Sequence, residues 1–182
     1  VYREATTDKA TDFKAILTKI KASEADAIVW GGLEDTAATL TKQARELGLQ
    51  QKLLMFDAVC TDNYITLSGD TSIGVLCSVT GVPLSEMPEG AAFKERFEKR
   101  FNGQKVQGFA PFAYDAVYTV VEAIKKAGTT EDSAKVAAAM EGIQAKGLSG
   151  NIAFEPSGER KDGMITILEQ KGKEFVPIDK AR

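Results

Sequence analysis

Two neighbouring apolar runs end in residues that could hold a small ligand. Residues 27–30 are followed by Gly31-Gly32, and residues 53–56 are followed by Asp57. Glycines let a ligand approach the backbone, and a carboxylate can accept charge-assisted hydrogen bonds from an ammonium group, each worth roughly 1.5–3 kcal/mol. The pattern favours a polar pocket with one anionic anchor. The residues alone leave open a second interpretation, in which Asp57 only caps the next helix or makes a turn.

Motifs for other kinds of chemistry are missing from the sequence. It contains no histidine, so it cannot build a Ser-His-Asp or Cys-His arrangement or a histidine-ligated zinc site. No phosphate-binding glycine loop and no G-x-S-x-G elbow occurs. Cys60 and Cys77 form no C-x-x-C and cannot fill a structural zinc site by themselves. We therefore expect a protein that is not an enzyme and has no metal and no cofactor.

Acidic pairs also have a simpler explanation than catalysis. Glu34-Asp35 and Glu131-Asp132 precede two predicted helices. Carboxylates are stabilised there by the helix dipole, which favours a structural role over a metal or acid–base role.

The charge balance argues against nucleic acid as a partner. The chain has 23 Lys and Arg against 26 Asp and Glu, for a net charge of −3, whereas neutralising phosphates needs a basic face. No apolar stretch approaches the ~20 residues that span a membrane. The chain opens Val1-Tyr2-Arg3-Glu4, without Met or a signal peptide. A processed or truncated chain is thus as compatible with the sequence as a complete one.

Strands alternate with helices in the part of the chain that must position these residues. The sequence predicts a buried strand over 1–6, a helix that Thr11 or Asp12 caps, a helix that stops at Gly48, and a short helix over 63–67. Strands are expected over 27–30, 53–56 and 74–79. This alternation is typical of an α/β unit with a mostly parallel sheet, where ligands bind outside the carboxyl ends of the strands.

From Gly90 onward the pattern changes to three successive helices and then a β-rich tail. The first helix carries a Phe93, Phe97 and Phe101 stripe that we expect in the core. The second, over 111–127, is apolar nearly all round and is therefore expected to be buried. The third contains Val136, Met140 and Ile143. The tail is predicted to form strands over 151–154, 164–168 and 174–178, with a turn at 156–158.

The sequence resembles the branched-chain amino-acid (Leu/Ile/Val) binding proteins of ABC importers. The similarity covers essentially the whole chain in order, which is far more specific than any single motif. It is carried by Asp12-Phe13, by the segments 28–32, 42–48, 67–70, 112–117 and 147–154, and by Gly158.

This resemblance implies an α/β type I periplasmic-binding-protein fold, with two lobes joined by crossover strands around a ligand cleft. The chain would be the C-terminal half, with the N-terminal half absent. Residues 1–79 would form the C-terminal lobe without its first strand and helix. Residues 80–146 would be a helical segment returning to the N-terminal lobe, and 147–182 the crossover and closing strands.

The resemblance also implies the ligand contacts. Asp57 matches the acidic residue that takes the ammonium group of the ligand. Leu33, after Gly32, matches a position that faces the ligand, and Phe109 matches an aromatic contact near the hinge. Relatives often carry a larger side chain at the position of Leu33, and commonly glycines where this chain has residues 56–58. Both departures bear on the choice of ligand. Ser and Thr residues that hold the ligand carboxylate would belong to the absent half.

The implied function is a periplasmic solute-binding protein that closes around a small aliphatic amino acid and delivers it to the membrane permease of an ABC transporter. A ligand-sensing domain of a receptor or regulator is the alternative. Since the periplasm is oxidising, we also predict a Cys60–Cys77 disulfide, against the alternative of two buried free cysteines. The predicted helices from Gly90 onward present large apolar faces. We therefore expect the segment to belong to a longer chain or to complete its core with another copy.

Overall fold

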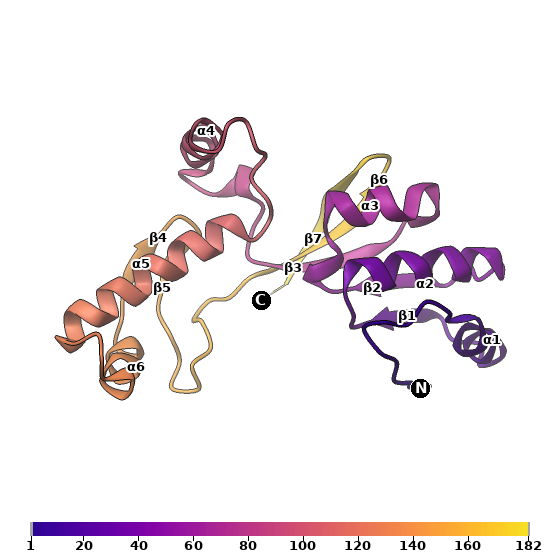
Figure 1. Cartoon of the computed structure of the whole chain (residues 1–182), viewed down its shortest axis with the longest axis horizontal. Helices are drawn as coiled ribbons and strands as arrows, with labels where there is room; N and C mark the ends of the chain where they lie inside the picture. Colours follow the sequence, from indigo (N-terminus) through magenta and orange to yellow (C-terminus); the bar gives the residue numbers. More distant parts are fainter. Residues whose placement is uncertain (1, 182) are drawn as a thin grey trace. The chain divides into compact units, whose positions relative to one another are not determined.

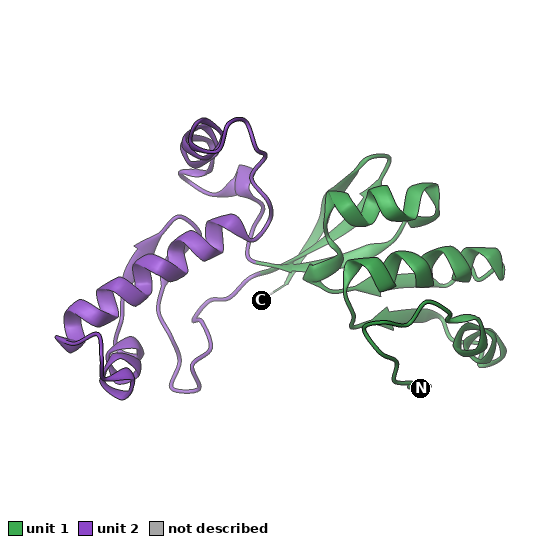
Figure 2. Ribbon diagram, viewed as in Figure 1, with its two compact units in different colours: residues 1–80, 165–181 green, residues 81–164, 182 purple. Residues whose placement is uncertain are grey.

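The computed structural model describes residues 2–181, which divide into two compact units (Figure 2). Unit 1 comprises residues 2–80 and 165–181, and unit 2 comprises residues 81–164. The chain therefore leaves unit 1 once, builds unit 2, and returns.

Unit 1 is built on one five-stranded sheet of order β1-β2-β3-β6-β7 (Figure 1). Its first three strands are parallel, and the last two run antiparallel to their neighbours. The strands are β1 (Ala27–Trp30), β2 (Lys52–Met55), β3 (Leu76–Thr80), β6 (Ile165–Lys171) and β7 (Glu174–Ala181). The parallel strands predicted from short apolar runs are thus confirmed, and the sequence-distant β6 and β7 complete the sheet.

The helices of unit 1 pack with one face of this sheet into a single core. They are α1 (Lys14–Ala22), α2 (Glu34–Glu46) and α3 (Asp62–Ser68), with 3₁₀ turns η1 (Asp57–Val59) and η2 (Gly69–Ser72). The N-cap of α1 is Phe13, without a side-chain cap hydrogen bond, so neither Thr11 nor Asp12 is the cap that the sequence predicted. Asp12 lies one residue earlier, and its Oδ1 accepts the main-chain N–H of Lys14 at 2.9 Å. The core joins helix side chains to alternate strand side chains, among them Leu17, Leu40, Tyr64, Ile28, Leu53, Met55 and Cys77.

The opposite face of the sheet is less covered. Val29, whose side chain alternates with that of buried Ile28, is 61% exposed. Leu54, its ladder partner in β2, and Leu76, the partner of Leu54 in β3, are half-buried. Parallel sheets are normally covered on both faces, so unit 1 retains apolar surface that its own helices do not bury.

The predicted strand over residues 1–6 is wrong for its described part. Val1 lies outside the described residues, and residues 2–6 are irregular and exposed. A strand needs both a ladder partner and an apolar face to bury. Within the described part of the chain β1 pairs only with β2, and Tyr2 is 40% exposed.

Unit 2 contains three helices, a 3₁₀ turn and a small hairpin. The helices are α4 (Gly90–Arg100), α5 (Ala110–Ala127) and α6 (Ser133–Glu141), the turn is η3 (Leu84–Glu86), and β4 (Ala145–Gly147) pairs antiparallel with β5 (Gly150–Ile152). Two small apolar clusters hold it together, one around Phe93 and Leu148 and one where Ala123 of α5 meets Ala139 and Ile143. The predicted turn at 156–158 is present, with Gly158 N–H donating to the carbonyl oxygen of Glu155 at 2.9 Å.

Helix α5 is not buried as its composition predicted. Val117 is 62% exposed and Tyr118 is 56% exposed. The buried stripe of α5 consists instead of small and polar residues such as Asp115, Thr119 and Ala123. When a helix is apolar on all sides, its sequence does not indicate which side packs against the rest of the protein. In α5 the large side chains of Val117 and Tyr118 lie on the exposed side of the helix. The phenylalanine stripe of α4 is likewise core only in part, because Phe93 is buried whereas Phe101 is 46% exposed.

No helix among residues 2–181 combines the length and hydropathy needed to cross a bilayer.

Candidate functional site

The strand register brings the two sequence-predicted segments to one edge of unit 1. Trp30 is the ladder partner of Met55, and Met55 is the ladder partner of Cys77. Since these strands are parallel, their carboxyl ends lie side by side. The segments that follow them, 31–33 and 56–58, therefore leave the sheet at the same edge, the one where ligands bind in open α/β sheets.

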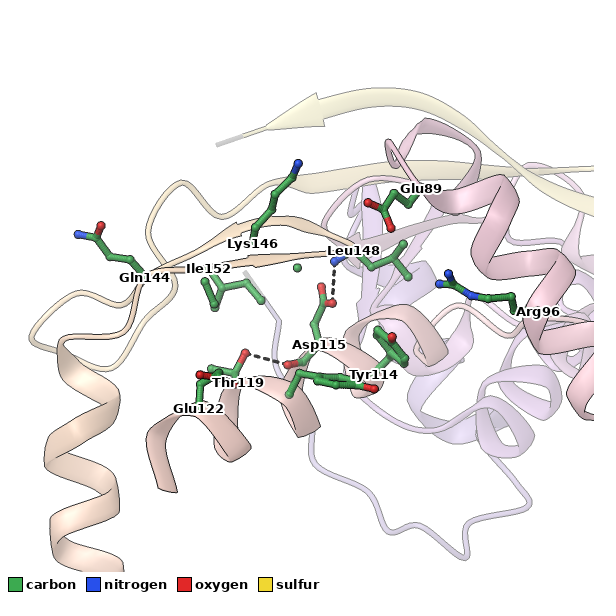
Figure 3. Close-up of a pocket in the computed structure, with 13 residues that line it drawn as sticks. Glu89, Arg96, Tyr114, Asp115, Thr119, Glu122, Gln144, Lys146, Leu148 and Ile152 are labelled. Atoms are coloured by element: carbon green, nitrogen blue, oxygen red, sulfur yellow. Dashed lines mark hydrogen bonds between the residues drawn. The ribbon is translucent and has the colours of Figure 1, made fainter. Parts of the chain in front are cut away.

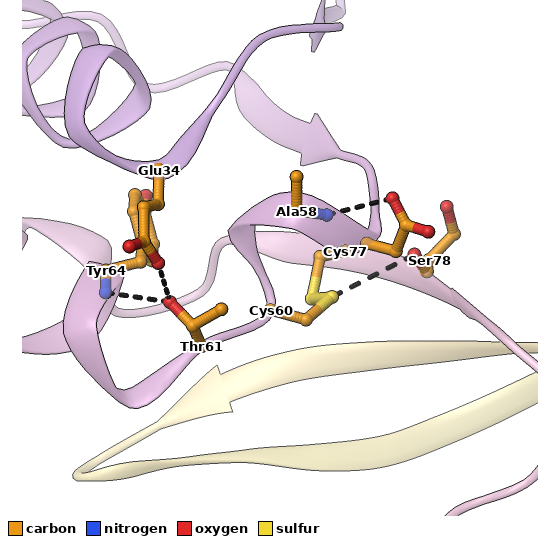
Figure 4. Close-up of a disulfide and its surroundings, with 8 residues drawn as sticks. Glu34, Ala58, Cys60, Thr61, Tyr64, Cys77 and Ser78 are labelled. Atoms are coloured by element: carbon orange, nitrogen blue, oxygen red, sulfur yellow. Dashed lines mark hydrogen bonds between the residues drawn. A yellow bond between two sulfur atoms is a disulfide. The ribbon is translucent and has the colours of Figure 1, made fainter. Parts of the chain in front are cut away.

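Asp57 presents a carboxylate at this edge that is only partly engaged. It opens η1, directly after β2, and is half-buried. Its Oδ1 accepts the main-chain N–H of Ala58 at 2.9 Å (Figure 4). Within residues 2–181 the carboxylate has no other hydrogen bond, and no Lys or Arg forms an ion pair with it. Its remaining acceptor capacity and its negative charge are available to a cationic ligand.

The capping interpretation of Asp57 is wrong. The cap of α3 is Thr61, whose hydroxyl oxygen accepts the Tyr64 N–H at 3.0 Å (Figure 4). Asp57 does take part in a turn, but through its backbone: its carbonyl oxygen accepts the Cys60 N–H at 3.1 Å. The turn thus uses the main chain and leaves most of the carboxylate unused.

The two segments at this edge also carry two large, exposed apolar side chains. Leu33 precedes α2 and is 58% exposed, and Phe56 is 48% exposed. The sequence interpretation included Leu33 but treated Phe56 only as a departure from relatives. The sequence did indicate Phe56, because an aromatic residue directly before a carboxylate at the end of a strand lies at the same edge of the sheet.

Gly32 has a packing reason of its own. A Cβ at Gly32 would lie 2.5 Å from the Trp30 ring, closer than real contacts allow, whereas a Cβ at Gly31 would have its nearest neighbour, the Phe56 ring, at 3.8 Å. The Trp30 ring also makes an edge-to-face contact with Phe13, with centroids 5.5 Å apart. Gly32 thus lets the indole fold back over the strand end, in addition to any role toward a ligand.

Phe109 belongs to unit 2. It immediately precedes α5 and is 53% exposed. That Phe109 and Asp57 contact the same ligand stays a prediction.

The predicted disulfide between Cys60 and Cys77 is present, and the alternative of two free cysteines is wrong. The two Cα atoms are 5.9 Å apart, well within the range that a disulfide spans. Cys77 is fully buried in β3, and Cys60 Sγ lies 3.9 Å from the carbonyl oxygen of Ser78 (Figure 4). Because a disulfide sulfur carries no proton, the approach of Cys60 Sγ to the Ser78 carbonyl oxygen is a contact and not a hydrogen bond.

Glu34 has a structural role at the same edge. Its carboxylate accepts a hydrogen bond from the Thr61 hydroxyl (Figure 4) and another, at 2.7 Å, from the Asn63 amide. It therefore ties the start of α2 to the start of α3, as the helix-terminal position of the acidic pair predicted.

Unit 2 has a separate cavity of about 490 Å³ between α4, α5 and the β4–β5 hairpin (Figure 3). The buried carboxylate of Asp115 lies in its wall, but it already accepts the Leu148 N–H at 2.7 Å and both the N–H and the hydroxyl of Ser149 at 2.8 and 2.5 Å. Asp115 therefore holds the hairpin and has little capacity left for a ligand. A hydrogen bond with Tyr118 raises the pKa of Tyr114, whose phenol lines the cavity, above its usual 10.0.

Sequence reasoning missed the role of Asp115. A signal was available, because Asp115 is the one acidic residue in the first part of an otherwise apolar helix. Across residues 2–181, no three His, Cys, Asp or Glu side chains gather as a metal site would require.

Comparison with known proteins places this geometry in a family. The periplasmic binding protein family model matches residues 1–174. An "Amino acid binding protein" of Pseudomonas aeruginosa is 31% identical over 177 residues, which cover 95% of this chain and 46% of that protein. The leucine-, isoleucine-, valine-, threonine- and alanine-binding protein of the same organism is 28% identical, with 87% and 42% of the two chains covered. The chain thus spans about half the length of the curated relatives it matches.

Solved structures show the same fold. A leucine-binding protein from Thermotoga maritima matches with a TM-score of 0.82 at 23% identity, over 94% of this chain and 49% of the other. A branched-chain amino-acid substrate-binding protein from Streptococcus pneumoniae, solved with isoleucine, matches with a TM-score of 0.73 at 21% identity, over 93% and 50%. The expected α/β type I periplasmic-binding fold is confirmed, and the chain belongs to the periplasmic binding protein family.

Proposed function

We propose that this chain supplies one wall of the ligand cleft of an amino-acid-binding protein, and that Asp57 binds the ammonium group of the ligand. The observation that carries the proposal is a half-buried carboxylate at the carboxyl ends of parallel strands, with which no cation of residues 2–181 forms an ion pair. Pairing with an ammonium group would supply the missing countercharge. A charge-assisted hydrogen bond of this kind contributes roughly 1.5–3 kcal/mol.

The neighbours of Asp57 favour an amino acid with an aliphatic side chain. Leu33 and Phe56, in the two segments at this edge, offer exposed apolar surface, and no second charged side chain follows β1 or β2 before α2 or α3 begins. Ligand pockets of this type combine apolar walls with a few placed polar groups. Named relatives bind leucine, isoleucine and valine, among other amino acids. A branched aliphatic amino acid therefore fits both the residues at this edge and the ligands of these relatives.

The proposed mechanism is closure of two lobes around one ligand, after which the closed form is recognised by the permease of an ABC importer. In that mechanism residues 1–79 form the C-terminal lobe, residues 80–146 belong with the second lobe, and residues 147–182 cross back. Phe109 would reach the ligand near the hinge, and a segment equivalent to the other half of the relatives would hold the ligand carboxylate. The protein would act in the periplasm, where the disulfide is stable.

A thermal-shift screen of the full-length protein tests the ligand class. Leucine, isoleucine and valine should raise the melting temperature, because a ligand at 100 times its Kd adds about 2.7 kcal/mol to stability. The matched compounds are the corresponding 2-oxo acids, which keep the side chain and carboxylate but lack the ammonium group. They should give no shift. Equal shifts from both series, or no shift from any amino acid, would contradict the proposal.

A further inference from the structure

The short segment that carries Asp57 is flanked by two residues that are both attached to Cys77 of β3. Met55, the last residue of β2, is the ladder partner of Cys77. Cys60 is joined to that same Cys77 by the disulfide, with their Cα atoms 5.9 Å apart. Residues 56–59 therefore form a short loop whose two ends are both fastened to Cys77, with Asp57 inside it.

Packing alone does little to hold the ligand-facing part of this loop. Phe56 is exposed, and Asp57 and Ala58 are half-buried. Only Val59 is fully buried. Two backbone hydrogen bonds shape the turn, from Val59 N–H to the Phe56 carbonyl at 2.9 Å and from Cys60 N–H to the Asp57 carbonyl at 3.1 Å. The position of the Asp57 carboxylate thus depends on how firmly the loop ends are held.

The disulfide holds the second end of the loop, at Cys60, covalently to β3. Beyond it, Thr61 caps α3 and donates to Glu34, which fixes the start of the next helix and not the loop itself. Without the covalent bond, the turn from Phe56 to Cys60 would keep its two backbone hydrogen bonds, the bond from the Ala58 N–H to Asp57 Oδ1, and the buried side chain of Val59. A carboxylate on a looser loop must be ordered when the ligand binds, and that ordering reduces affinity.

We propose that the Cys60–Cys77 disulfide is a positioning element for the Asp57 carboxylate and thereby sets the affinity for the ligand ammonium group. The proposal rests on the proposed function, in which Asp57 is the ammonium anchor. Loss of the disulfide leaves the sheet of unit 1 in place, loosens residues 56–60, and weakens binding about 10-fold, chiefly through faster ligand release.

The test compares two variants of the full-length protein. Cys60→Ser/Cys77→Ala removes the disulfide. Leu17→Ala is the matched control, because Leu17 is fully buried in α1, so the substitution destabilises unit 1 by a comparable amount without touching the loop. The leucine dissociation rate, measured by stopped flow well below both unfolding midpoints, should rise about 10-fold in the double variant and stay within about twofold of wild type in the control. Equal release rates in all three proteins, or equal increases in both variants, would overturn the proposal.

Hydrogen exchange without ligand separates this proposal from the proposed function. The amides of Val59 and of position 60 should exchange at least 10-fold faster in the double variant, while the amides of the β1–β2 ladder stay unchanged. If no amino acid binds but this local loosening occurs, the proposed function fails and the anchoring of the loop stands. If amino acids bind and the loop amides do not change, the function stands and the positioning role is refuted.

A second variant covers the case in which the double variant does not fold. Ala58→Gly keeps the disulfide but adds backbone freedom inside the loop. It should weaken leucine binding severalfold with little change in the free energy of unfolding, and unchanged affinity would count against the proposal.

Discussion

The carboxylate of Asp115 on α5 accepts both the main-chain N–H and the hydroxyl of Ser149, at 2.8 and 2.5 Å. Ser149 in turn accepts Arg160, whose guanidinium donates to its hydroxyl oxygen at 2.9 Å and to its carbonyl oxygen at 3.2 Å. Gly147 allows this approach, since a Cβ there would lie 2.5 Å from Asp115 Oδ2. One buried acidic side chain thus attaches the β4–β5 hairpin and the segment after it to the longest helix of unit 2.

Replacing Asp115 should destabilise unit 2. Asp115→Ala leaves the buried N–H of Leu148 and the N–H of Ser149 without their acceptor, which should cost about 2–4 kcal/mol of unfolding free energy. Urea unfolding followed by circular dichroism measures the loss. Glu131→Ala removes an exposed acidic side chain of the same unit and should change stability by less than about 0.5 kcal/mol. Similar losses in both variants would show that the Asp115 hydrogen bonds matter little.

The two consecutive glycines after β1 should differ sharply in their tolerance of a methyl group. Gly32→Ala places a Cβ 2.5 Å from the Trp30 ring and must displace it, whereas the Cβ of Gly31→Ala meets its first neighbour at 3.8 Å. We expect Gly32→Ala to cost about 1–3 kcal/mol and Gly31→Ala less than about 1 kcal/mol. The fluorescence of Trp30, the single tryptophan of this chain, reports both the unfolding and the displaced ring. An unperturbed spectrum in Gly32→Ala would contradict the packing.

The exposed apolar side chains should contribute to binding and not to folding at the candidate site. Phe56→Ala removes a ring that is 48% exposed, so the free energy of unfolding should change little. Affinity of the full-length protein for leucine should fall about 10-fold, because a desolvated aromatic contact contributes on the order of 1–2 kcal/mol. Calorimetry with leucine and glycine checks this. Equal loss for glycine, which has no side chain, would mean that Phe56 acts on something other than the aliphatic group.

The outer face of α5 should make the 182-residue chain self-associate when it is produced alone. Val117 and Tyr118 are 62% and 56% exposed, and contiguous apolar patches of this kind normally have a partner. We expect sedimentation to give a mass above 19.6 kDa and calorimetry to detect no amino-acid binding. Val117→Glu/Tyr118→Glu should shift the chain toward monomer without loss of helix content. A compact monomer of the unaltered chain with micromolar affinity would contradict this expectation.

Sequence patterns predicted the elements whose cause is local. Strands β1 and β2 follow from short apolar runs that end at Gly31 and Asp57, and the end of α2 follows from Gly48, which adopts φ +74°. The position of Asp57 at the sheet edge was predictable for the same reason, because chain order and parallel pairing place it there.

Features set by distant partners were not predictable. The strand β4 consists of Ala145-Lys146-Gly147 and carries no apolar pattern; it exists because β5 pairs with it and Asp115 holds the turn between them. The exposed side of α5 could not be inferred, since an all-round apolar helix has no marked face. The loop anchored twice at Cys77 likewise required the register of β2 against β3.

The account depends most on the charge of Asp57. The direct measurement is isothermal titration calorimetry of leucine into the full-length protein, its Asp57→Ala variant, and Asp62→Ala, which removes an equal charge from an exposed position in α3. Removing one partner of a closed-cleft ion pair leaves the ammonium group uncompensated, at a cost of about 3–5 kcal/mol. The account predicts at least about a 100-fold loss of affinity for Asp57→Ala, with its unfolding midpoint and the Asp62→Ala affinity unchanged. Leucine binding to Asp57→Ala at wild-type affinity would contradict it.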